Sequence, residues 1–299
     1  MKSQISKSVI TLCGIIFLGI SGCSDSPVEP EKQMVDSGSW YETAYKWPHD
    51  GNPLESEHFV IYSDAASLEA RQWLSQICED TYLMIIETLG IADVSVFRFP
   101  ADRNNKIHIY AYKNYFPTEW GGQAYYGGYI IYSPDHPQRT LIGHTEPENY
   151  IPLVQHELMH VIQTLILGAN DERILYAWFA EGIAIQISDD IFYENIDSRQ
   201  KLDSLISIYG MLNPISLRYS WTYPEIEGVI TYYYYPMFEL AVKYLLDPKG
   251  MGRSFHDVRD VLFDAANEIP FNTSLENRFG ISQMAYETQF FDLMQAYLE

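Results

Sequence analysis

The sequence has little cysteine and little positive charge. Three cysteines, Cys13, Cys23 and Cys78, occur in 299 residues, and the first two lie within or directly after an N-terminal apolar segment. Only Cys78 remains for the folded part, which excludes an intramolecular disulfide there. Lys and Arg number 19 against 40 Asp and Glu, so the net charge is −21. A surface this acidic repels a phosphate backbone, and the sequence therefore predicts no nucleic-acid partner.

Long hydrophobic runs are also missing. The N-terminal run Val9–Ile20 has twelve residues, whereas a membrane-spanning helix needs roughly 20. The run follows Lys2 and Lys7, an order that is typical of an export signal. We therefore interpret residues 1–22 as a signal peptide that is removed from the mature protein.

The end of this segment carries a second pattern. Ile20-Ser21-Gly22-Cys23 resembles the lipobox of bacterial lipoproteins, in which the cysteine becomes lipidated and is the first residue after cleavage. The resemblance implies a lipid on Cys23 and a protein anchored to a membrane of the bacterial cell envelope, with the outer membrane or cell surface favoured by Ser24. Residues 23–39 are polar without apolar periodicity, which predicts a flexible tether. The alternative is an ordinary signal peptide with a chance cysteine.

The rest of the chain begins with strand patterns and continues with helical ones. Residues 40–150 contain predicted strands at His58–Ser63, Lys106–Tyr112 and Tyr125–Tyr132 and a predicted helix at Ser67–Leu89, in which Cys78 is expected to be buried. Residues 151–299 contain predicted helices at Ile151–Leu167, Ile174–Ile187, Ser198–Ile208, Tyr235–Leu246, Phe255–Ala266 and Gln283–Leu298. This order predicts an α+β fold, with a small mixed sheet followed by a mainly helical part and a cleft between them, in one domain over residues 40–299.

The first of the later helices carries the most specific motif. His156, Glu157 and His160 form an H-E-x-x-H pattern. Residues four apart share a helix face, so both imidazoles can reach one metal ion while Glu157 lies beside it to accept a proton from water. The alternative is a helix with two incidental histidines, but its other residues are mostly apolar. Burying two histidines and a carboxylate there without a cation would be costly.

A third ligand is expected on the next helix. Glu181 lies twenty-one positions after His160, inside the apolar run Trp178–Ala184. A buried acid of this kind is rare unless it is paired or bound to a metal, although hydrogen bonds alone remain an alternative. Gly182 is expected to let this helix pack closely on the histidine helix.

Together, Gln155–His160 and Trp178–Ala184 resemble the gluzincin clan of zinc metallopeptidases, and especially the small bacterial peptidase MA-like proteins. The metzincin pattern is excluded, because it would need Gly and His where the chain has Gln163 and Ile166. The resemblance covers most of residues 56–299. It implies one Zn²⁺ per chain, held by the two histidines and Glu181, with Glu157 as general base.

The resemblance also implies how a substrate would be bound. Tyr125–Tyr132 would be an edge strand that pairs with an extended peptide, with Gly127, Gly128 and Tyr129 as its binding residues. Tyr235, or Tyr234 beside it, would donate a hydrogen bond to the oxyanion, although tyrosines that only pack are equally compatible with the sequence.

The sequence differs from the clan at two points that bear on the predicted activity and on the surroundings of the ligands. No Gly-x-Met-Glu-Asn motif is present to bind a free amino terminus, which favours an endopeptidase over an aminopeptidase. Thermolysin-like enzymes have an Asp four residues after the glutamate ligand, where this chain has Ile185. The expected partner is a peptide or protein substrate, and the protein is expected to be a monomer. The alternatives are a non-catalytic surface lipoprotein that uses the fold as a binding module, and a hydrolase of non-peptide amides.

Overall fold

The computed structural model describes residues 53–63, 68–101, 103–112, 122–132, 147–168, 175–188 and 230–299, together with Ser207, Asn213 and Ile215. The predicted signal peptide, Cys23 and the tether lie outside these residues, as does nearly all of the helix predicted at Ser198–Ile208. The described residues belong to one compact unit. None of their helices combines the length and the apolar character that crossing a membrane would require.

The N-terminal part of this unit contains a mixed sheet. Its strands are β1 (Leu54–Glu55), β2 (Phe59–Ser63), β3 (Ile107–Tyr112), β4 (Gly122–Tyr125) and β5 (Gly128–Tyr132), in the order β1-β2-β3-β5-β4. β2, β3 and β5 run parallel, and β1 and β4 pair antiparallel at the two ends. Helices make up most of the remaining described chain, so the predicted α+β class with a small mixed sheet is confirmed.

The single edge strand predicted at Tyr125–Tyr132 is wrong. The segment is instead a hairpin whose two strands, β4 and β5, are joined by a turn at Tyr126 and Gly127. Gly127 has φ +79, and a Cβ there would lie 2.9 Å from the Pro100 ring, so the turn depends on glycine at this position. β5 lies between β3 and β4, which leaves β4 as the end strand.

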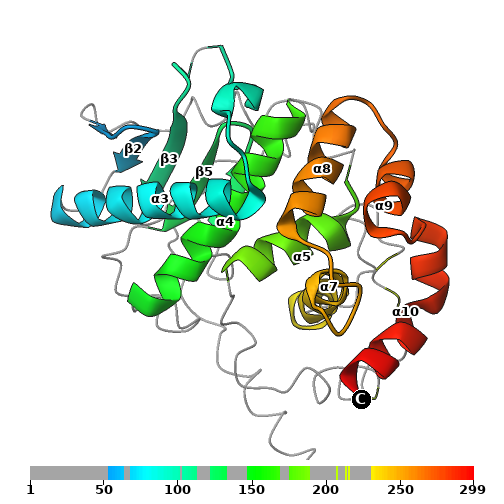
Figure 1. Ribbon diagram of the computed structural model, residues 1–299. Helices are drawn as coiled ribbons and strands as arrows, with labels where there is room; N and C mark the ends of the chain where they lie inside the picture. Colours follow the sequence, from blue (N-terminus) through cyan, green and yellow to red (C-terminus); the bar gives the residue numbers. More distant parts are fainter. Residues whose placement is uncertain are drawn as a thin grey trace, which may run out of the picture. The chain divides into compact units, whose positions relative to one another are not determined.

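Helix α3 (Leu68–Leu89) packs against the sheet and α4 (Figure 1). It begins one residue after its predicted start and ends at Gly90, whose φ of +65 stops the helix. Cys78 is buried on its inner face, as predicted. Leu83, which follows the apolar pattern, is exposed instead, since only one side of the helix meets the core.

Six helices follow among the described residues of the second part. They are α4 (Pro147–Leu167), α5 (Ala177–Ser188), α7 (Ile230–Leu246), α8 (Phe255–Ala266), α9 (Phe271–Phe279) and α10 (Gln283–Leu298). The bounds of α8 and α10 match the prediction, α4 starts four residues early, and α5 starts three residues late. α7 begins five residues before its predicted start, so that Pro236 lies well inside the helix rather than at its second position. α9 was not predicted, because it is short and Pro270 before it gives no side-chain cap.

These helices place α4 and α5 at the centre of the unit. α4 packs against β4, β5 and α3 on the sheet side and against α5 on the other, and α5 in turn packs on α7 (Figure 1). A Cβ on Gly182 would lie 2.5 Å from the carbonyl oxygen of Phe238 and from Val242. Gly182 therefore allows close packing of α5 on α7, and the expectation that it would face the histidine helix is wrong.

Candidate metal centre

Helix α4 is buried on most of its sides. Val154, Leu158 and Val161 have no exposed surface, and even its polar residues His156 and Glu157 are only 8% and 7% exposed. The apolar residues drive the helix into the core through the hydrophobic effect and carry these polar side chains with them. The desolvation cost of burying them calls for partners close by.

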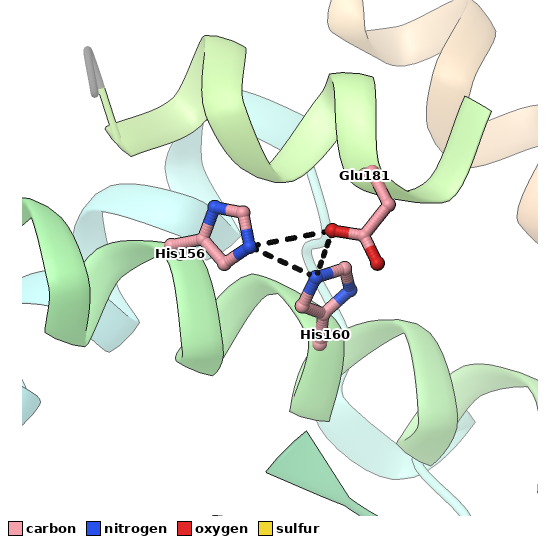
Figure 2. A group of neighbouring side chains, drawn as sticks. All are labelled: His156, His160 and Glu181. Atoms are coloured by element: carbon pink, nitrogen blue, oxygen red, sulfur yellow. Dashed lines mark hydrogen bonds and ion pairs between the residues drawn. The ribbon is translucent and has the colours of Figure 1, made fainter. Parts of the chain in front are cut away.

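Glu181 on α5 supplies one such partner. His156 and His160 point from α4 toward its carboxylate (Figure 2). The Nε2 atoms of the two histidines are 3.2 Å apart, and Glu181 Oε2 lies 3.5 Å from His156 Nε2 and 3.2 Å from His160 Nε2. Three ligand-type atoms from two helices therefore form a nearly equilateral triangle.

The size of this triangle matches a small tetrahedral cation. Two ligand atoms bound to tetrahedral zinc at its usual bond lengths lie about 3.3–3.4 Å apart. The three observed distances fall on either side of that value. His156, His160 and Glu181 could thus hold a metal ion, and nitrogen with carboxylate oxygen is a ligand set that suits zinc.

The electrostatics of the three groups agree with their geometry. Burial lowers the pKa of His160, but the Glu181 carboxylate, with smaller contributions from Glu157 and Gln163, raises that pKa to about 9. Burial would likewise raise the pKa of Glu181, yet His160 and His156 hold it well below its ordinary value. Glu181 is therefore a carboxylate that needs a positive partner, which a proton on His160 or a bound cation can provide.

Glu157 is not one of the triangle atoms and faces β4 instead. A Cβ on Gly122 would lie 2.6 Å from Glu157 Cγ and 2.9 Å from its Oε1. The backbone N–H of Ala124 donates a hydrogen bond to the Glu157 carboxylate. Burial raises the pKa of Glu157, and the two histidines oppose that rise. A buried acid with a raised pKa next to a candidate metal centre is suited to accept and return a proton.

Tyr235 reaches the same region from α7. Its ring centre is 6.4 Å from that of His156, with the two rings 25° apart, and 6.0 Å from that of Phe238. The structure thus brings together Tyr235 and the motif on α4. The side chain of Tyr234, the alternative donor, lies outside the described residues.

The residues predicted to bind a substrate backbone lie elsewhere. Gly128 pairs with His108 on one side and Tyr125 on the other, and Tyr129 pairs with Ile109 and Ala124. Gly127 is in the turn. Strand addition cannot take place at a backbone with neighbours on both sides, so their predicted place on an edge strand is wrong.

Two residues of the candidate metal centre were not identified from the sequence. Gly122 lies against Glu157, and Gln163 bonds His160 and α5. Gly122 lies three residues before the predicted strand Tyr125–Tyr132, and nothing in the local sequence indicates its role. Gln163 is one helical turn after His160, so its spacing could have suggested a contact.

The chain was compared with protein-family models and with curated proteins. No protein-family model matches this chain, and none of the curated proteins matches it. The gluzincin resemblance therefore depends on the residues of this chain and on their geometry.

Proposed function

We propose that this protein is a zinc-dependent metallopeptidase of the gluzincin type, and an endopeptidase rather than an aminopeptidase. The observation that carries the proposal is the triangle of His156, His160 and Glu181 with the carboxyl group of Glu157 beside it. A metal-storage or structural site would need the three ligands but not the buried acid.

Each group of the proposed centre has its own role in the reaction. Zinc, when bound, supplies Lewis-acid chemistry toward water and the scissile carbonyl. Glu157 takes a proton from the attacking water and later passes it to the leaving amine, which its buried position beside the triangle supports. The Tyr235 hydroxyl donates to the oxygen that becomes negative in the transition state.

The end strand β4 is the proposed binding strand for the substrate. It runs directly alongside Glu157, and among the described strands it pairs on one side only, with β5. An extended peptide added to the other side would lie next to the general base. β4 thus takes the place that the sequence suggested for Gly127, Gly128 and Tyr129.

The proposal includes the location of the protein at a membrane. A lipid on Cys23 and a tether over residues 23–39 would hold the catalytic unit at a membrane of the bacterial cell envelope. A peptide or protein at that surface would be the substrate.

A binding module on the same fold is the second candidate, and Glu157 separates the two. Keeping a buried carboxyl costs stability, since desolvation opposes its ionisation. A surface used only for binding does not need a buried carboxyl group at this position. Water activation does need one, as the proton acceptor. A hydrolase of non-peptide amides would use the same groups and differs only in the substrate.

The test uses Glu157→Gln, which removes the proton acceptor and keeps the shape. Zinc content should stay near one per chain, while cleavage of a quenched peptide library should fall by about 10²–10⁴, the usual contribution of a general base. Glu276→Gln, an exposed change on α9, serves as the control and should cleave at the wild-type rate. A zinc-loaded wild type that cleaves no peptide, with a partner protein bound equally by wild type and Glu157→Gln, would establish the binding module instead.

A further inference from the structure

The Gln163 side chain joins the two ligand helices. It lies on α4 three residues after His160 and is 4% exposed. Its Oε1 is 3.0 Å from His160 Nδ1, and its Nε2 donates to the carbonyl oxygen of Ala180 on α5 at 3.0 Å. Both ends of the amide are therefore bonded inside the protein.

The second of these bonds decides the orientation of the amide. A backbone carbonyl can only accept, so the NH₂ end of Gln163 must face Ala180. The oxygen end must then face His160, and because that oxygen only accepts, Nδ1 of His160 carries the hydrogen. Once the ring is neutral, as metal ligation requires, its lone pair lies on Nε2. Nε2 is the atom that faces His156 and Glu181.

The same bond reaches the backbone next to the third ligand. Ala180 directly precedes Glu181, so the Gln163 amide links the histidine helix to the position from which Glu181 extends. One side chain thus orients the ring of one ligand and ties it to the backbone of another.

We infer that Gln163 is a positioning residue of the metal centre, which selects the Nε2-ligating form of His160 and fixes its distance to Glu181. A partner on the outer nitrogen of a ligating histidine generally orients the ring and strengthens metal binding. Ile185, which is buried, occupies the position where thermolysin-like enzymes carry an aspartate. The inference rests on the proposed metal site.

The test compares three variants of the full-length protein. Gln163→Met keeps the length of the side chain and removes both hydrogen bonds. Gln163→Glu keeps an oxygen for His160 and loses the donor to Ala180. Gln186→Met removes a half-buried amide from α5 and is the control. Zinc affinity is measured by competition with a chromophoric chelator, and the protein labelled with ¹⁵N-histidine is examined by NMR in its zinc-loaded form.

Gln163→Met should lose about 10–100-fold in zinc affinity, the usual effect of removing such a partner. Gln163→Glu should recover most of this loss, and Gln186→Met should bind like the wild type. The Nδ1–H signal of His160 should exchange slowly with water in the wild type and in Gln163→Glu, and quickly in Gln163→Met. A purely structural role would not produce this pattern.

The outcomes that contradict the inference differ from those that contradict the proposed function. If the wild type binds no zinc, the proposed metal site is wrong. A wild type that binds zinc, with Gln163→Met equal to it, overturns the role of Gln163 alone. If both Gln163→Met and Gln163→Glu lose zinc affinity equally and the Nδ1–H signal is unchanged, the inference is wrong. Gln163 would then only connect α4 to α5. If Gln163→Met fails to fold, the Nδ1–H exchange in Gln163→Glu decides: slow exchange supports the inference and fast exchange overturns it.

Discussion

Gly122 and Glu157 share a small volume between β4 and α4. Bonded neighbours aside, carbon atoms normally stay about 3.5–4.0 Å apart, and a Cβ on Gly122 would come within 2.6 Å of Glu157 Cγ. Glu157 is buried and also accepts a hydrogen bond from the Ala124 backbone, so it has little room to move aside. The missing side chain on β4 thus sets the position of the proposed general base.

Replacing Gly122 with alanine should therefore displace the Glu157 carboxyl group while leaving the metal ligands in place. Misplacing a catalytic group by about 1 Å can cost on the order of 10² in rate, and we expect a loss of this size in kcat. The measurements are steady-state cleavage of a peptide substrate and zinc content of the same samples. Full activity in Gly122→Ala would show that Glu157 does not act from its position against β4.

Tyr235→Phe removes the proposed oxyanion donor and keeps the ring that lies beside His156. We expect kcat to fall by about 10²-fold with KM nearly unchanged, because the hydrogen bond strengthens only in the transition state. Tyr244→Phe on the same helix is a matched control, since Tyr244 packs on Tyr286 and Tyr297. Equal effects of the two changes would mean that Tyr235 only packs.

The pH dependence of zinc binding follows from His160. In the metal-free protein the pKa of His160 is about 9, above the unfolded value near 6.5. Its proton therefore stabilises the fold fully below about pH 6.5, and that contribution disappears as the pH rises through 9. Zinc must displace the same proton, so its affinity should rise between pH 6.5 and 9. Calorimetry in buffers of different ionisation enthalpy should detect close to one proton released per zinc at pH 7. No release would contradict the paired state of His160 and Glu181.

At the scale of elements, the position of Glu181 depends on how α5 packs against α7. Gly182, the next residue, brings the two helix backbones so close that any Cβ would touch the Phe238 carbonyl. A backbone atom cannot move aside as a flexible side chain can. The distance between these helices is therefore set by a residue that has no side chain.

Gly182→Ala tests this packing through the sign of its effect. In a helix with free space, glycine to alanine usually stabilises a protein by roughly 0.5–1 kcal/mol. Here we expect destabilisation by about 1–3 kcal/mol from overpacking, together with weaker zinc binding as Glu181 shifts. Urea denaturation of the zinc-free and zinc-loaded protein measures both effects. Increased stability would show that α5 and α7 are not in close contact at Gly182.

At the scale of the whole molecule, the proposed catalytic unit and the proposed anchor are separate parts of the chain. The ligands, the general base and the end strand all lie within residues 122–181, whereas the lipobox pattern ends at Cys23. Changing the anchor should therefore alter where the protein is found and leave its chemistry intact.

Cys23→Ser should abolish fatty-acid labelling in cells and move the protein out of the membrane fraction, while peptide cleavage by the released protein persists. The free energy of membrane binding comes from burying the acyl chains, which only a lipidated cysteine provides. Cys78→Ala is the control and should keep the label, because Cys78 is buried on α3. Labelling that persists in Cys23→Ser would contradict the lipobox interpretation.

Several features were predictable because the residues that determine them are near one another in the sequence. His156 and His160 share a face through their spacing of four, and the structure places them as predicted. α8 and α10 begin where Ser254 and Ser282 cap their first turns, so the start of each helix is specified by residues next to it in the sequence. The burial of Cys78 followed from the apolar periodicity of α3. Each is a short-range signal that the chain carries whatever its tertiary structure.

Only the tertiary structure decided which segments meet. That β4 and not β5 is the end strand, and that Gly122 faces Glu157, depends on a hairpin turn and on strand order, which the hydrophobic pattern does not specify. The contact of Gly182 with α7 and the bond from Gln163 to Ala180 likewise join residues 56 and 17 positions apart. The sequence by itself determined the ligand types and their spacing, because these are local. The folded chain determined their partners, because packing between distant segments sets those distances.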